Sequence, residues 1–271
     1  MNLLETLDQE VVVCDGAMGT LLIAQGEVLG SCLEGLNLTD AERITAIHRS
    51  YVEAGARILR TNSLGANTIR LAAHGLEARA NEINWQAAQC AVQAGKGHDV
   101  LVAGSVGPLT GLDIPHAQKA QIFRAQIGAL LDGGARMIFF ETFQDVQELV
   151  CALECKYALH HCPAACSMVF DRNGKLPDGT DIAQVFQVLQ QNDAELIGVN
   201  CMETTEILPL LQRSPTPTPL AILPSTRASP EAFAHGAMEL IHCGARVLGG
   251  CCGTTPAHIA ALSAHIAAAK S

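Results

Sequence analysis

One stretch near the end of the chain shows the pattern on which the fold is built: Ala245-Arg246-Val247-Leu248-Gly249-Gly250-Cys251-Cys252-Gly253-Thr254. A short apolar run is followed at once by glycines and two cysteines. Side chains alternate along a strand, so adjacent cysteines would point to opposite faces. A tight glycine turn removes this difficulty, because glycine reaches backbone conformations that are closed to other residues. The stretch therefore predicts a strand whose end brings two thiols to one point.

Seven other apolar runs come before this one, and each is followed by polar or glycine-rich residues. The eight runs cover residues 11–14, 56–59, 100–103, 137–140, 164–169, 196–199, 220–223 and 246–248. Helical periodicity lies between them, in a segment that begins at Thr39 or Asp40 and in segments 80–94, 117–131, 145–159, 181–190, 230–242 and 256–269. The chain is 49% hydrophobic but only 4% aromatic, which suits parallel strands covered by helices.

Strands that alternate with helices predict a parallel sheet, and eight repeats close into a (β/α)8 TIM barrel. We expect one such α/β domain over residues 1–271. An open doubly wound sheet is the alternative, but no Gly-x-Gly-x-x-Gly fingerprint follows the first apolar run. The active site of a barrel lies at the C-terminal ends of its strands. Polar candidates follow several runs at this edge: Asp15, Asn62, Glu141, Asn200, Cys201, Cys251 and Cys252.

The three cysteines Cys201, Cys251 and Cys252 are the strongest candidates for a metal site. Convergent thiolates bind soft or borderline metals, of which zinc is the commonest. Three protein ligands and an open fourth position are typical of catalytic zinc. Buried cysteine without a metal is the ordinary alternative for a free thiol. A second cluster, Cys155, His160, His161 and Cys162, lies at the end of a helical segment and is interpreted as ordinary helix-end residues.

Charge and cysteine content exclude several classes of protein. The net charge of −10 argues against nucleic acid or an anionic membrane surface as a partner. No apolar run approaches the roughly 18 residues of a membrane span. The start of the chain lacks the features of a signal peptide. Eleven cysteines without the spacing of a disulfide scaffold favour a reduced, cytoplasmic protein.

The order and spacing of several motifs resemble the homocysteine S-methyltransferase family over essentially the whole chain. The matching segments are 15–20 (DGAMGT), 51–56 (YVEAGA), 61–67 (TNSLGAN), 103–108 (AGSVGP), 140–143 (FETF), 198–201 (GVNC) and 249–255 (GGCCGTT). The pattern is most similar to the homocysteine domains of cobalamin-dependent methionine synthase and of fusions with methylenetetrahydrofolate reductase. One segment departs from the family, because Pro224-Ser225-Thr226-Arg227 stands where Pro-Asn-Ala-Gly is common.

The resemblance implies methyl transfer to the thiol of homocysteine, giving methionine, with Zn²⁺ held by the three cysteines. It further implies that Asp15 and Glu141 hold the α-amino group, whereas from the sequence alone Asp15 could equally cap a turn. The backbone N–H groups of Ala17 and Met18 would take the carboxylate. Asn200 and Asn62 would either position ligands or substrate, or satisfy backbone groups at strand ends.

Bound to zinc, the thiol of homocysteine would lose its proton and attack a methyl group in line. The chain shows no cobalamin, folate or reductase module, so a separate corrinoid protein is the favoured donor. The alternatives are methyltetrahydrofolate by way of a corrinoid, S-methylmethionine or another sulfonium, and a betaine. Sulfonium and betaine cations are usually held by aromatic residues, and the chain has one Trp and two Tyr. Two other readings stay open: methylation of a different thiol, and a non-catalytic module that binds zinc or a thiol.

Overall fold

The computed structural model of the chain describes residues 3–109 and 114–269. In these residues eight parallel strands form one sheet in the order β1-β8-β7-β6-β5-β4-β3-β2. The strands are β1 (Val12–Val13), β2 (Ile58–Arg60), β3 (Leu101–Val106), β4 (Met137–Phe143), β5 (Ala164–Met168), β6 (Leu196–Glu203), β7 (Leu220–Ser225) and β8 (Ala245–Leu248).

The two ends of this sheet meet and close it into a barrel. Cys14, directly after β1, forms a parallel bridge with Ile58 of β2. Two backbone hydrogen bonds flank the bridge, from Arg57 N to Val13 O at 2.8 Å and from Asp15 N to Ile58 O at 3.0 Å. The predicted α/β barrel is therefore confirmed, and the open doubly wound alternative is excluded.

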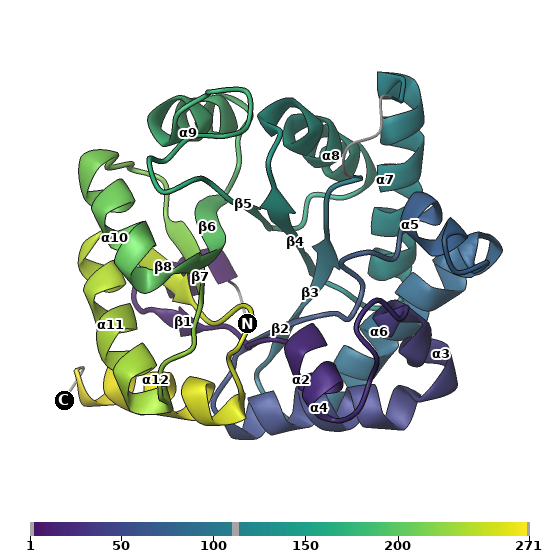
Figure 1. The fold of residues 1–271 in the computed structure, drawn as a ribbon, viewed down its shortest axis with the longest axis horizontal. Helices are drawn as coiled ribbons and strands as arrows, with labels where there is room; N and C mark the ends of the chain where they lie inside the picture. Colours follow the sequence, from purple (N-terminus) through teal and green to yellow (C-terminus); the bar gives the residue numbers. More distant parts are fainter. Residues whose placement is uncertain (1–2, 110–113, 270–271) are drawn as a thin grey trace.

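Helices surround the strands on the outside of the barrel (Figure 1). The long ones are α4 (Ala41–Glu53), α6 (Ala80–Gly95), α7 (His116–Asp132), α8 (Val146–Leu159), α9 (Ile182–Gln191), α10 (Thr204–Arg213), α11 (Pro230–His242) and α12 (Pro256–Ala268). The short ones are α1 (Leu3–Leu7), α2 (Gly19–Ala24), α3 (Leu36–Thr39) and α5 (Thr68–Ala72), with single 3-10 turns at Leu33–Gly35 and Glu77–Arg79. None of the described helices combines the length and apolar character that a bilayer crossing requires.

The expected strands and long helices agree with the observed ones except between β6 and β7, and the short helices α1, α2, α3 and α5 were not expected. Each of the eight strands lies at a predicted apolar run, and seven helices lie at the predicted segments. Helix α10 was not among the predicted segments, and it contains Pro209, which removes a backbone donor and normally breaks a helix. A capping box between Glu203 and Glu206 stabilises the first turn, and an apolar face containing Ile207 and Leu210 is buried.

Strand alternation decides which side chains reach the interior of the barrel. Met137 and Phe139 of β4 belong to the interior cluster, whereas Ile138 and Phe140 pack in the layer beneath the helices. With a period of two, the next interior position on β4 is Glu141. The same count places Arg60 above Ile58 on β2. Polar side chains thus form the last interior layer at the C-terminal end of the barrel.

Candidate active site and metal centre

The sulfur atoms of Cys201, Cys251 and Cys252 all lie within 4.8 Å of one another. They form the only group of three or more potential metal-ligating residues of this kind in residues 3–109 and 114–269. Cys201 is partly buried at the end of β6, Cys251 is buried after β8, and Cys252 is exposed. The structure therefore brings together the three cysteines that the sequence analysis selected, and leaves Cys155 and Cys162 elsewhere.

Cys201 and Cys251 are joined in the structure as a disulfide, with their Cα atoms 5.5 Å apart, and Cys252 is a free thiol. Three free thiols were expected at this point from the sequence. Metal binding requires thiolates, so all three cysteines can act as ligands only when this disulfide is reduced. The donor set of the reduced form, three sulfurs at one point, fits zinc or another thiophilic metal.

A compact turn after β8 holds the two adjacent cysteines. Gly253 has φ +83°, and a Cβ there would lie 2.0 Å from the carbonyl oxygen of Thr226. A Cβ on Gly250 would lie 2.4 Å from Thr254 Oγ1. Thr254 Oγ1 donates to the carbonyl of Cys251 at 2.7 Å. Glycine is therefore required on both sides of the cysteine pair, as the sequence predicted.

The loop that departs from the family pattern lies directly against this turn. Cys251 N donates to Pro224 O at 2.8 Å, and Thr226 N donates to Cys252 O at 3.0 Å. Both contacts use the backbone, so the turn is held independently of the side chains of Ser225 and Thr226.

The backbone of Cys201 is in the left-handed region, with φ 58°. Alternation along β6 would direct this side chain away from the interior, yet Cys201 packs against the interior cluster. The unusual conformation turns the sulfur toward the other two cysteines. Asn200, which is fully buried, donates from Nδ2 to Cys201 Sγ at 3.5 Å and accepts from Thr142 N at 3.0 Å. Asn200 thus contacts both a candidate ligand and the end of a neighbouring strand.

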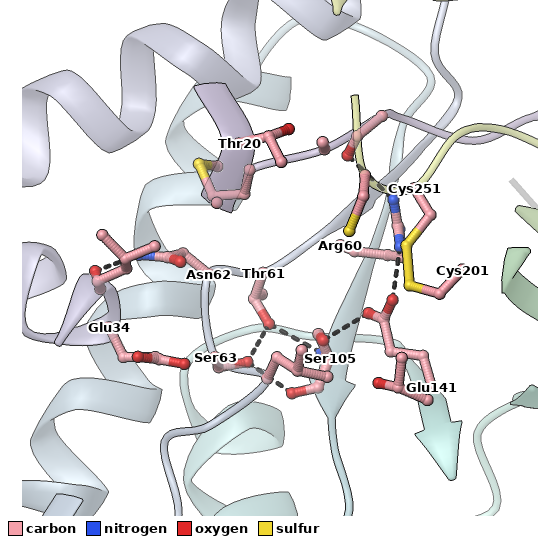
Figure 2. A pocket seen from close by; sticks show the side chains of 18 of the residues that line it. Thr20, Glu34, Arg60, Thr61, Asn62, Ser63, Ser105, Glu141, Cys201 and Cys251 are labelled. Carbon is pink, nitrogen blue, oxygen red and sulfur yellow. Dashed lines mark hydrogen bonds and ion pairs between the residues drawn. A yellow bond between two sulfur atoms is a disulfide. The ribbon is translucent and has the colours of Figure 1, made fainter. Parts of the chain in front are cut away.

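A cavity of about 300 Å³ opens beside the cysteines at the C-terminal end of the barrel. Figure 2 shows Cys201 and Cys251 on one side of it and Glu34 on the opposite side. The lining residues are Gly16, Ala17, Met18, Gly19, Thr20, Ile23, Leu33, Glu34, Arg60, Thr61, Asn62, Ser63, Leu64, Ser105, Glu141, Thr142, Cys201, Cys251 and Cys252. The cavity therefore joins apolar surface, a few charged groups and the three sulfurs.

Arg60 links the two carboxylates predicted to hold an amino group. Its Nε donates to Asp15 Oδ1 at 2.8 Å, and its Nη1 donates to Glu141 Oε2 at 2.6 Å. The other oxygen of each carboxylate is also occupied, because Asp15 Oδ2 accepts from Arg60 N at 2.8 Å and Glu141 Oε1 accepts from Ser105 Oγ at 2.6 Å. Arg60, Asp15 and Glu141 are all buried.

Burial and charge act against each other in this network. Burial raises the pKa of the Asp15 carboxyl, and the guanidinium of Arg60 opposes that shift. Burial alone would lower the pKa of Arg60, but Glu141 and Asp15 outweigh it and raise that pKa well above its ordinary value. Arg60 consequently stays charged. Together with two carboxylates it leaves the network with one net negative charge.

The remaining predicted site residues differ in their contacts. Ala17 N donates to Thr254 Oγ1 at 3.0 Å. This N–H therefore already has an acceptor, whereas it was expected to be free to bind a carboxylate. Met18 lines the cavity. Asn62 Nδ2 donates to Leu33 O at 2.8 Å and to Asn37 Oδ1 at 3.1 Å, which ties the loop at the cavity wall to β2.

Arg60 was not predicted as a site residue from the sequence. The available signal was an arginine at the end of a run of buried apolar residues, since buried arginine is almost always paired with carboxylates. Ser105 lies in the matching segment 103–108, but its hydrogen bond to Glu141 depends on the pairing of β3 with β4. That pairing is a tertiary relationship without a local sequence signal.

The fold and the site define the protein as an α/β barrel with a candidate three-cysteine metal centre beside a buried charge network. The model of the family described as homocysteine S-methyltransferase matches residues 12–266. The chain belongs to this family.

Curated and solved relatives agree with this assignment. Methionine synthase of Mycobacterium tuberculosis is 32% identical over 99% of this chain, which spans about a quarter (26%) of that protein. Homocysteine S-methyltransferase of Escherichia coli is 29% identical, with 94% of this chain and 95% of the relative covered. The crystal structure of homocysteine methyltransferase MmuM from Escherichia coli in its metallated form matches with a TM-score of 0.87, at 30% identity over 98% of this chain and 100% of that chain. Its oxidised form matches with a TM-score of 0.88, at 29% identity and the same coverage.

Proposed function

We propose that this protein transfers a methyl group to the thiol of L-homocysteine, giving methionine. The observation that carries the proposal is the convergence of Cys201, Cys251 and Cys252 at the wall of a cavity that also contains Glu141 and Arg60. A thiol and an amino-acid end group can thus be bound in one cavity. Family membership supports the same reaction.

In the reduced protein, Cys201, Cys251 and Cys252 would hold a zinc ion. Zinc supplies Lewis acidity that deprotonates the thiol of the acceptor at neutral pH, where a free thiol with a pKa near 8.5 is mostly protonated. The metallated crystal form of a relative supports a metal in this family. Asn200 would orient Cys201 through its Nδ2 hydrogen bond.

The residues of the chain position the acceptor for this chemistry. Glu141 lies in the cavity wall, where its carboxylate would hold the α-amino group, while the apolar side chains of Met18, Ile23 and Leu33 would exclude water around the aliphatic part of the acceptor. No general base is needed among these residues, because coordination to the zinc would lower the pKa of the acceptor thiol.

For the methyl donor, we propose a methylcorrinoid carried by a separate protein. The described lining of the cavity includes no Phe, Tyr or Trp. Small sulfonium and betaine cations are usually held by aromatic rings, so this lining offers them little. A donor brought from outside needs only the open side of the cavity.

The direct test is methionine formation by the reduced, zinc-loaded protein with L-homocysteine and, in separate assays, methylcobalamin, S-methylmethionine and glycine betaine. We expect methionine with methylcobalamin and none with the Cys252→Ser variant. Methionine from S-methylmethionine alone would keep the acceptor and overturn the donor. Failure with all three donors, in protein that binds homocysteine and zinc, would contradict the proposed reaction.

A further inference from the structure

A surface groove lies between the neighbouring helices α6 and α7 on the outside of the barrel (Figure 1). Its volume is about 490 Å³. Glu82 and Trp85 of α6 line one side, and Arg124, Gly128 and Asp132 of α7 line the other. The groove shares no lining residue with the cysteine cavity. Methyl transfer at the cysteines therefore does not explain its features.

Apolar surface is exposed along the α6 side of this groove. Trp85 is the only tryptophan in the chain, and 42% of it is exposed. Val92 follows two turns later on the same face of α6 and is 39% exposed. Single exposed apolar residues are common on protein surfaces, whereas apolar residues grouped on one face are typical of interaction sites, in which tryptophan is enriched. The α6–α7 groove is therefore a candidate protein interface.

Gly128 on the α7 side is not required by packing within the described part of the chain. It lies inside α7, where glycine is less favourable than alanine. A Cβ at this position would meet nothing within 4 Å, so a side chain would fit in the isolated chain. Ala125 and Ala129 beside it also line the groove with short side chains. Glycine permits close approach of another backbone, which here can come only from a second molecule.

The charges of the groove are arranged symmetrically about Gly128. Arg124 lies four residues before it and Asp132 four residues after it, so all three share one face of α7. Arg124 and Asp132 are exposed, and neither forms an ion pair among the described residues. In two antiparallel copies of α7 related by a two-fold axis at Gly128, Arg124 of each copy would face Asp132 of the other. This surface is thus complementary in charge to itself.

We propose that the α6–α7 groove is the interface of a homodimer, in which the α7 helices of two copies pack antiparallel across a two-fold axis at Gly128. Each copy contributes α6 and α7, so that the contact is a packing of four helices. Trp85 of each copy is covered by α7 of the other, and two Arg124–Asp132 pairs flank the axis. The interface contains no residue of the cysteine cavity, so this proposal is independent of the proposed function.

Sedimentation equilibrium of the full chain, with reductant present to prevent disulfide-linked dimers, measures the association. Between about 0.1 and 100 μM, the mass should rise from the chain mass of 28.5 kDa toward twice that value. The fluorescence of the chain's one tryptophan reports on Trp85 alone. Quenching of this fluorescence by acrylamide should decrease over the same concentrations, because the second copy covers the ring.

Three variants test the antiparallel arrangement. Arg124→Asp should weaken association at least tenfold, because it places an aspartate opposite Asp132 of the other copy. The double variant Arg124→Asp/Asp132→Arg should recover most of the loss, since opposite charges face each other again. Gly128→Leu should prevent association by blocking the close approach of the two helices. Its unfolding at low concentration should match or exceed wild-type stability, because leucine favours the helix and the isolated chain has room for it.

Leu29→Gln is the matched control, because Leu29 is 82% exposed and lies outside the groove. It should associate as wild type does. If Gly128→Leu does not fold, the two charge variants still test the interface, since both positions are exposed.

A wild type that stays at the chain mass at every concentration would overturn the proposal and leave the groove to a different partner. A dimer that persists in both Gly128→Leu and Arg124→Asp would overturn it as well, as would a double variant that associates no better than Arg124→Asp. Association lost in Leu29→Gln but kept in Gly128→Leu would place the interface elsewhere on the surface and refute this one.

Discussion

The amide of Asn200 is hydrogen-bonded to the backbone of Thr142, with 3.0 Å between Thr142 N and Asn200 Oδ1. This contact joins the ends of β4 and β6 at a point where both strands are irregular. Thr142 has φ 64°, and Cys201, next to Asn200, has φ 58°. Such backbone conformations are uncommon for residues other than glycine and cluster at functional sites. The contact thus fixes the strand end that carries Glu141 relative to the one that carries Cys201.

Loss of a single cysteine should remove the metal. We expect about one zinc per chain in the reduced wild type and a large loss in Cys252→Ser, because serine is a poor ligand for zinc compared with thiolate. Cys252 is exposed, so the substitution should leave the barrel folded. Elemental analysis of the purified protein measures the content. Cys243→Ser, at a partly buried cysteine outside the triad, is the matched control and should keep its zinc.

Oxidation should abolish metal binding in proportion to the disulfide formed. Eleven thiols should react in the reduced, denatured chain and nine in protein whose only disulfide joins Cys201 to Cys251. The nine-thiol form should bind no zinc at this site, since two of the three ligands are no longer thiolates. Treatment with a reductant should restore both the thiol count and the zinc. Equal zinc affinity in the nine-thiol and eleven-thiol forms would show that the ligands are misassigned.

The two acidic residues should differ in their effect on homocysteine binding. Glu141→Gln should weaken binding by roughly ten- to a hundredfold, because it removes the charge that faces the ammonium group. Asp15→Asn should weaken it less, because Asp15 contacts Arg60 and does not line the cavity. Calorimetric titrations of both variants, with unchanged zinc content as the control, measure the difference. Loss of affinity in Asp15→Asn greater than in Glu141→Gln would contradict the assignment.

Part of the fold and part of the candidate site could be predicted from the sequence alone. Alternating apolar runs and helical segments were sufficient for the barrel, and the cysteines at two strand ends were sufficient for the triad. Arg60 and the occupied N–H of Ala17 were not predicted, since both depend on contacts between strands far apart in sequence. The side chain of Cys201 departs from the alternation of its strand because its backbone is in the left-handed region, and no residue pattern predicts this conformation. Helix α10 was not among the predicted segments, and in the structure burial of its apolar face outweighs the local effect of Pro209.

A buried histidine should make the barrel sensitive to acid. His48 in α4 is fully buried, and neither ring nitrogen has a hydrogen-bond partner among the described residues. Burial lowers its pKa from 6.5 to about 4. The unfolded chain therefore binds more protons than the folded one between these values, so stability is present above pH 6.5 and is lost as the pH falls toward 4.

The loss over this range should be about 3 kcal/mol, at 1.36 kcal/mol per pKa unit. Denaturant unfolding of wild type and His48→Leu across this pH range measures it. The variant should lack this part of the pH dependence, whereas replacement of the exposed His74 by Asn should leave the wild-type profile. If His48→Leu and wild type lose stability in parallel, His48 is not the cause.

We expect the three cysteines to hold one metal that binds the thiol of the acceptor as its fourth ligand. X-ray absorption at the zinc edge, on reduced protein with and without L-selenohomocysteine, tests it most directly. We predict sulfur scattering from three cysteine ligands in the free protein, and one additional selenium scatterer in the first shell when selenohomocysteine is bound. A first shell without selenium, in a sample where calorimetry shows the ligand bound, would contradict the account.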